Sequence, residues 1–235
     1  MTGARGKEGA GGLTACAYPV PPTNEFMKYT PLLWIGAVPV FLVMQIYFLG
    51  RKMSTPEAMI RPTPNGLSNQ QRETISRYNE WLASANLELR TTFQFGAIQV
   101  AVFQQNDQPR FFSFLFHQRV TFSAESYLED LTILDTSNSG SLGLFPRPGA
   151  YVQSFPNISA QETWQRHLEG EAHLTKKFGF HWVPIKHPYE ELVVEAMRVR
   201  MKFNRSQSFW PFRVLYRYFV TRHRIANRTI MQQFP

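Results

Sequence analysis

The sequence predicts an α+β fold: a single N-terminal transmembrane helix, then a helix, an antiparallel sheet of about five strands and two or three C-terminal helices. A charge-free apolar segment predicts the transmembrane helix, short segments of alternating polarity predict the sheet, and capped amphipathic segments predict the helices. The chain of 235 residues is 43% hydrophobic and 14% aromatic, which excludes disordered and collagen-like classes. Its one cysteine, Cys16, excludes an internal disulfide and a multi-cysteine metal site.

The transmembrane helix is predicted over residues 30–50, after a lead of residues 1–29. No charged residue occurs between Lys28 and Arg51, and the 20 uncharged, mainly apolar residues 31–50 would span about 30 Å of hydrocarbon as a helix. A cleaved signal peptide is disfavoured by the long lead and the lack of a small-residue cleavage site, and a buried core helix by the small interior that remains. More bases follow the span than precede it, which favours a single-pass membrane protein with a cytoplasmic C-terminal domain.

A linker and a first helix are predicted after the anchor. Residues 51–67 hold three prolines and one glycine, which is typical of a linker that precedes a soluble domain of residues 68–235. Ser68 and Gln71 match a capping box, and apolar residues then recur at helical spacing. These signals predict one helix over residues 69–86.

The sheet is predicted from β-branched and aromatic residues that alternate with polar ones. Gly96 interrupts a long strand and is expected to form a bulge, while the turn residues 106–109 predict a hairpin. Because no helical segment separates the strands, we expect antiparallel pairing. The expected strands cover residues 89–104, 110–117, 119–123, 130–135 and 151–155.

Two or three helices are predicted to close the chain. Ser159 and Glu162 match a capping box and Gly179 suits a left-handed C-terminal cap, so the first helix lies between them. A second helix begins at Pro188 and a third at Pro211, reaching about Arg228. We expect one core between these helices and one face of the sheet, and its expected members are Phe93, Phe95, Phe112, Phe114, Phe116, Trp164, Leu168, Leu192 and Val193.

The positive charge of the chain is concentrated in a basic C-terminal tail. Residues 196–235 contain eight Arg, one Lys and no acid, while residues 1–195 are nearly neutral. On a helical wheel, four arginines share one stripe: Arg213, Arg217, Arg224 and Arg228. Apolar side chains share another arc: Phe212, Leu215, Tyr216, Phe219, Ala226 and Ile230.

Three interpretations of this tail stay open. Its apolar arc can pack on the sheet while the arginines are solvated, the arginines can meet anionic lipid headgroups, or they can contact an acidic protein or nucleic-acid phosphates. Sequence-specific nucleic-acid recognition is not expected, because the chain has no helix-turn-helix, zinc or RNP-type motif. The four arginines are therefore the candidate membrane or partner surface.

Candidate chemistry is sparse. His167 and Glu171 share a helix face, but His173 is rotated away from it, so a metal site is not expected. His181 and His187 flank a loop and could serve a pocket, although no carboxylate orients them in the sequence. The acidic residues Glu125, Glu129, Asp130 and Asp135 are interpreted as the surface of strands and turns. No nucleotide- or cofactor-binding motif is present, and no cofactor is expected.

The function expected from these features is interaction. We expect a non-enzymatic module, held at the membrane through residues 31–50, that docks a partner protein or a subunit of a membrane complex. The alternative is a membrane-bound enzyme or small-ligand binder with a pocket between the sheet and the C-terminal helices, near His181 and His187. A cavity lined by ionisable groups favours the alternative, and a filled sheet face favours docking.

The anchor can be tested by extraction. The intact chain should stay with the membrane pellet after carbonate washing and enter the detergent phase on partition, because about 30 Å of apolar helix is stable only in hydrocarbon. Recovery of the intact chain in the carbonate supernatant would contradict the prediction.

Overall fold

The computed structural model describes residues 37–38, 40–48, 50–51, 55–63, 66–106, 108–128, 130–139, 146–182 and 187–235. The chain divides into two units, Met1–Phe41 and Leu42–Pro235, and the sheet belongs to the second. The described residues between 37 and 51 are helical. Within the described part of the chain no helix is long and apolar enough to cross a bilayer. The expected anchor lies partly outside that part, so it stays a prediction.

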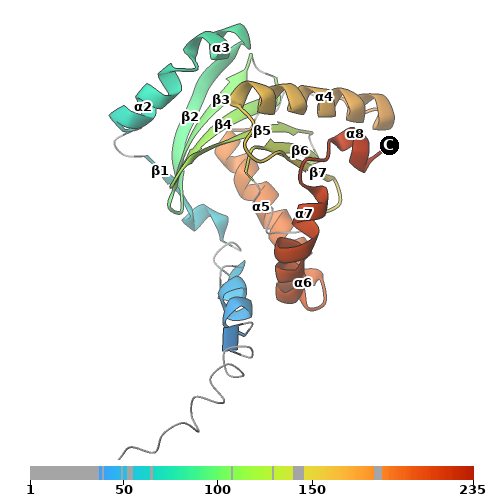
Figure 1. Ribbon diagram of the computed structural model, residues 1–235. Helices are drawn as coiled ribbons and strands as arrows, with labels where there is room; N and C mark the ends of the chain where they lie inside the picture. Colours follow the sequence, from blue (N-terminus) through green and yellow to red (C-terminus); the bar gives the residue numbers. More distant parts are fainter. Residues whose placement is uncertain are drawn as a thin grey trace, which may run out of the picture. The chain divides into compact units, whose positions relative to one another are not determined.

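The domain is α+β, with a seven-stranded mixed sheet whose strands follow one another in sequence order. The first six strands pair antiparallel, and β7 pairs parallel with β6. Figure 1 shows this sheet with helices on both of its faces. The strands are β1 (Ile60–Pro62), β2 (Leu87–Phe95), β3 (Ile98–Gln105), β4 (Arg110–Phe116), β5 (Val120–Tyr127), β6 (Ile133–Ser137) and β7 (Ala150–Ser154).

Each face of the sheet has its own apolar cluster. On one face α2 (Asn69–Ser76), α3 (Asn79–Ser84) and α4 (Ala160–Phe178) cover Phe103, Phe112 and Phe114. On the other face α5 (Tyr189–Ser206) packs on Phe93 and Phe111. Figure 1 shows α4 and α5 on opposite sides of the strands. The core is therefore double, which separates the side chains of every strand into two environments.

The prediction of one core on one face was wrong, and Gly96 is the reason. Gly96 has a φ of +59° and sits in a two-residue turn between Phe95 and Ile98, which are paired across the hairpin. Gly96 is thus a hairpin turn, favoured because a positive φ matches the strand twist, and not a bulge. Crossing this turn exchanges odd and even positions, so Phe93 shares a face with Val100. As a result Phe93, Phe95, Leu192 and Val193 lie opposite to Phe112, Phe114, Phe116, Trp164 and Leu168.

The sheet differs from the expected one at both edges. Part of the segment expected as a linker forms η1 (Pro56–Ala58) and β1, which pairs with β2. At the other edge β7 runs parallel to β6. Antiparallel pairing was expected there, because no helix was predicted between these two strands. The register shift of this sheet lies between Leu89 and Thr91, where the antiparallel ladder of β2 and β3 is interrupted.

The first helix is divided where one continuous helix was expected. Ser68 and Gln71 form the predicted capping box at the start of α2. The chain then turns at Tyr78, whose N–H donates to the Ile75 carbonyl at 2.8 Å, a tight bond that ends the α-helical ladder. The Tyr78 ring packs edge-on against Phe114 with centroids 5.4 Å apart. This contact holds the turn against the sheet and starts α3 in a new direction.

The N-cap at Ser159, the C-cap at Gly179 and the start of a second helix next to Pro188 are confirmed. Ser159 Oγ accepts a bond from the Glu162 N–H at 3.1 Å, and Gly179 closes α4 with a φ of +70°. The next helix, α5, follows Pro188 as predicted and carries two acids in its first turn. Both ends of α4 therefore lie where the capping residues predicted them.

The C-terminal tail is helical, and its orientation differs from the prediction in part: Arg213, Arg224 and Arg228 are exposed and Ile230 is buried, as expected. It forms α6 (Trp210–Tyr216), a π-helical turn η2 (Arg217–Thr221), α7 (Arg222–Ile225) and α8 (Ile230–Gln233). Arg217, expected on the outer stripe, is buried, while Phe212 and Phe219, expected to pack inward, are exposed. The π-helical turn adds a residue to the repeat, so a wheel drawn at 100° per residue loses its phase after Arg217, at Phe219. Phe212 precedes this turn, and it is exposed because α6 buries its other side, at Val214.

A chain of buried hydrogen bonds fixes α4 on the sheet. Arg110 in β4 forms an ion pair with Glu171 in α4, with Nη2 to Oε1 at 2.5 Å and Nε to Oε2 at 2.9 Å. Ser126 Oγ donates its proton to Glu171 Oε2 at 2.8 Å. Because Ser126 has one proton, its oxygen accepts the bond from His167 Nε2 at 2.8 Å.

The same chain continues to β7 and α8. With Nε2 protonated, a neutral His167 accepts at Nδ1 from Thr136 Oγ1 at 3.1 Å. Thr136 accepts in turn from Gln153 Nε2 at 2.8 Å, and Gln153 Oε1 accepts from the Ile230 N–H at 3.0 Å. Burial lowers the pKa of His167 to about 4. The negative charge of Glu171 opposes this shift, and the positive charge of Arg110 adds to it. Every donor therefore meets an acceptor when His167 is neutral.

This neutral histidine should make stability depend on pH. An unfolded histidine titrates near 6.5 and His167 at about 4, so the wild type should lose about 1.4 kcal/mol per pH unit between these values as pH falls. In urea unfolding, the stability advantage over His167→Gln should therefore shrink by about 3 kcal/mol from pH 7 to pH 4. The exposed His187→Gln is the control. Parallel pH curves for wild type and His167→Gln would refute the assignment.

Candidate ligand pocket

A cavity of about 460 Å³ lies between the sheet and α5. Its wall is mostly apolar and its size falls in the usual range for small-molecule sites. Phe93, Val100 and Leu115 line it from the strands, and Val193 and Met197 line it from α5. We call this space the sheet–α5 cavity.

Two carboxylates face this cavity from adjacent strands. Glu125 in β5 is paired in register with Asp135 in β6. Neighbouring residues in a strand point to opposite faces, so the burial of Ser126 and Thr136 beneath α4 directs Glu125 and Asp135 to the α5 side. Both carboxylates line the cavity. They were interpreted from the sequence as surface residues, and the structure corrects this.

Hydroxyl groups hold the two carboxylates in place. The Tyr127 hydroxyl donates to Glu125 Oε2 at 2.6 Å, and the Tyr189 hydroxyl donates to the same oxygen at 2.9 Å. Ser123 Oγ donates to Asp135 Oδ1 at 3.0 Å. Tyr189 comes from the first turn of α5, so it links the carboxylates to the opposite wall.

The electrostatics of the cavity favour a proton or another cation. Burial, followed by the Asp135 charge, raises the pKa of Glu125 to about 7, although Tyr127, Tyr189 and Arg200 act against this. Burial also raises the pKa of Asp135, against the Arg200 charge and the Ser123 bond. Glu125 can therefore gain or lose a proton near neutral pH.

Two arginines line the cavity in different ways. Arg200 in α5 lies among the carboxylates; burial lowers its pKa, while the charges of Asp135 and Glu125 oppose that shift. Arg147 donates to the backbone carbonyls of Leu131 and Pro148 and is engaged in the turn before β7. Arg200 is thus the main counter-charge that the described residues give to the carboxylate pair.

Most residues singled out in the sequence lie elsewhere. His181 and His187 do not line the described cavity: both are exposed, and His187 Nδ1 lies 3.6 Å from Glu191 Oε2. Asp130 accepts bonds from Thr132 in a turn, and Glu129 lies outside the described residues. The ionisable wall that favours a ligand site therefore exists, but other residues form it.

The histidines of α4 are structural. His167 and Glu171 share the sheet-facing side, as predicted, and His173 Nε2 bonds to the Phe234 carbonyl oxygen at 2.8 Å. In the part of the chain that the structure describes, no group of three or more His, Cys, Asp and Glu could hold a metal ion.

The arginines of the tail separate into two kinds. Arg213, Arg224 and Arg228 are exposed, whereas Arg217 points inward, where burial and then the Arg200 charge lower its pKa to about 10. A surface role for Arg213, Arg217, Arg224 and Arg228 stays a prediction.

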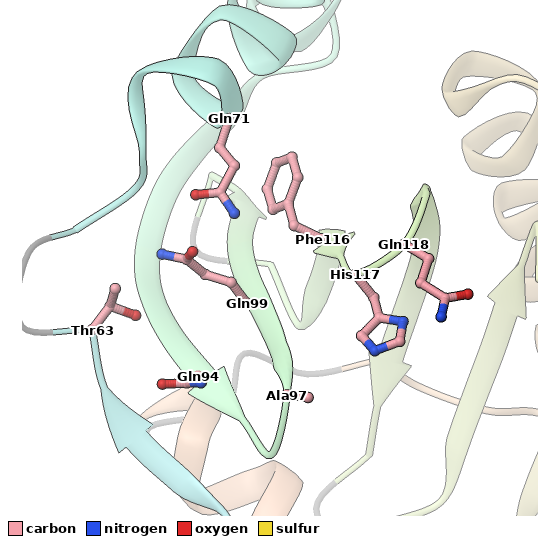
Figure 2. A pocket seen from close by; sticks show the side chains of 8 residues that line it. All are labelled: Thr63, Gln71, Gln94, Ala97, Gln99, Phe116, His117 and Gln118. Carbon is pink, nitrogen blue, oxygen red and sulfur yellow. The ribbon is translucent and has the colours of Figure 1, made fainter.

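A second hollow, of about 430 Å³, lies where β1, β2 and β3 meet α2. Figure 2 shows that its side chains are mainly neutral amides, with Gln94 and Gln99 along the strands and His117 on the loop after β4. The amides of Gln71 and Gln99 already bond to the backbone at Ser68 and Gly66. The described lining of this hollow contains no carboxylate, so the sheet–α5 cavity is the stronger candidate site.

Comparison of the chain with protein-family profiles, with curated proteins and with solved structures gives no match. The candidate function consequently rests on the geometry and chemistry of the cavity.

The Glu125 assignment can be tested by stability measurements. Because its pKa rises from 4.5 to about 7 on folding, the wild type should lose stability relative to Glu125→Gln as pH increases through this window. In thermal unfolding, the stability of Glu125→Gln relative to the wild type should increase from pH 5 to pH 8, because these values lie on either side of the Glu125 pKa of about 7. The exposed Glu88→Gln should not show this trend. An advantage of Glu125→Gln that is largest at low pH would contradict the assignment.

Proposed function

We propose that the domain binds a small amphiphilic molecule in the sheet–α5 cavity, with a protonated amine at the carboxylates. The observation that carries this proposal is a cavity with a mostly apolar wall in which the paired Glu125 and Asp135 face Arg200, while Arg147, which also lines the cavity, donates to backbone carbonyls. A volume of about 460 Å³ equals that of roughly 15 water molecules at about 30 Å³ each, which is enough for a small organic molecule.

The charge balance supports a cationic ligand group. Burial disfavours the ionised form of both carboxylates, and Glu125 takes up a proton near neutral pH although Arg200 lies beside the pair. A protonated amine would supply a positive charge to the carboxylates and would take the place of that proton. The apolar remainder of the ligand would pack against Phe93 and Val193, away from water.

This proposal corresponds to small-ligand binding at a membrane, and it includes no chemical step. The predicted anchor would hold the cavity near a bilayer, where amphiphilic molecules are concentrated. Docking of a protein partner or a subunit of a membrane complex rests on the outer surface of the domain and stays a prediction.

Binding can be measured with three probes that share one skeleton and differ in the head: 4-phenylbutylamine, 4-phenylbutanol and 4-phenylbutyrate. In calorimetric titration of the full chain in lipid nanodiscs, the amine should bind tightest and the carboxylate weakest. Amine affinity should rise from pH 6 to pH 8 as Glu125, with its pKa of about 7, loses its proton. The ammonium group itself stays charged over this range.

Matched variants locate the binding. Glu125→Gln should weaken amine binding about tenfold and remove its pH dependence, because a charge-assisted bond is lost, while the exposed Glu88→Gln should bind as the wild type does. Ala196→Trp, in the α5 wall, should abolish binding of all three probes without changing the circular dichroism spectrum. Tightest binding of the carboxylate, or unchanged binding in Ala196→Trp, would reject the proposal.

A further inference from the structure

The outer face of α6 and η2 carries large aromatic side chains in the solvent. Phe212, Tyr216 and Phe219 are spaced by three or four residues, so they follow one side of the helical segment, and Phe209 is the residue immediately before α6. Their exposed fractions are 79%, 56%, 58% and 55%. The opposite side contributes Val214 and Arg217 to the interior. The apolar arc of this segment is thus directed away from its own domain.

Arginines accompany these aromatic residues. Arg213 and Arg224 are exposed, and the guanidinium of Arg222 lies 3.9 Å from the centroid of the Tyr218 ring. No Asp or Glu occurs from residue 196 to 235, so no acid of this segment offsets them. We call the exposed side chains of Phe209, Phe212, Arg213, Tyr216, Phe219 and Arg224 the aromatic–arginine surface.

This surface begins beside the end of the predicted anchor. A Cβ at Gly50 would collide with the indole of Trp210, the first residue of α6, so the backbone at Gly50 lies directly against this ring. Just before Gly50, Tyr47 and Phe48 are exposed helical residues. Tyr and Trp at the end of an apolar segment are typical of the headgroup region of a membrane.

We propose that the aromatic–arginine surface lies in the headgroup region of a bilayer that contains anionic lipid. Aromatic side chains and arginines on one exposed helix are the combination that binds the interface, where rings enter the acyl boundary and guanidinium groups meet phosphates. The contact between Gly50 and Trp210 places this surface at the height where the apolar segment of the chain ends. A protein or a second copy of the chain is the competing occupant.

The test uses the full chain with Cys16→Ser, which removes the one native thiol. A nitroxide is attached at Phe212→Cys or at Phe219→Cys, and the control is Leu89→Cys, an exposed leucine in β2. The proteins are reconstituted in vesicles of phosphatidylcholine with or without phosphatidylserine. Collision rates of the label with oxygen, which enters lipid, and with a water-soluble nickel complex are then compared.

The proposal expects the ratio of oxygen to nickel collisions at positions 212 and 219 to exceed that at 89, and to increase with phosphatidylserine. Arg213→Gln and Arg224→Gln should each shift the equilibrium between lipid-bound and water-exposed positions about fivefold, in phosphatidylserine vesicles only, and added salt should have the same effect. A water-like ratio at both positions would overturn the proposal. Protection from both reagents, with cross-linking to a second chain, would overturn it in favour of a protein contact.

Discussion

The ion pair between Arg110 and Glu171, with the hydrogen bonds that extend from it, is the constraint on which the arrangement of this domain depends. Glu171 lies on the buried side of α4. Removing the partner of a buried charged group destabilises a fold by about 3 to 5 kcal/mol. The chain of donors passes through His167 and Gln153, so it fixes α4 on four strands at once. A slip of α4 by one residue would break the bonds of Glu171 to Arg110 and Ser126 and those of His167 to Ser126 and Thr136.

That constraint also determines the pocket. Ser126 and Thr136 must point toward α4 to bond with His167, and the alternation of a strand then leaves no freedom for Glu125 and Asp135. The polar groups on the α4 side satisfy one another, as in a structural network. Those on the α5 side include two carboxylates whose pKa values burial raises, which is a common feature of binding sites. The two faces of the same strands therefore separate stability from recognition.

Local chemistry predicted much of this fold, and long-range packing accounts for the rest. The caps at Ser68, Ser159 and Gly179 are properties of short segments, and the structure has them where the sequence placed them. The sequence did not show which side chains of the strands share a face. The turn at Gly96 exchanges odd and even positions, and the apolar alternation continues through this turn without a visible break. Glu125 could have been assigned to the interior by its parity with Tyr127 two residues later, a weak signal without the partner strand. Which side of α6 is exposed depends on which other elements of the domain pack against it, and a helical wheel of the segment alone gives no information on that packing.

The order of the sheet has a consequence for synthesis on the ribosome. From β2 to β6, each strand pairs with the next strand in the chain with no helix between them, so each pair can form soon after it emerges. The parallel strand β7 must instead return along the sheet, and α4 follows it in the chain. Until both have emerged, Phe112 and Phe114 lack the cover of Trp164 and Glu171 is not present to pair with Arg110. The nascent domain is therefore most prone to aggregate during translation of the short interval between β6 and the end of α4, where a pause would be harmful and a bound chaperone most useful.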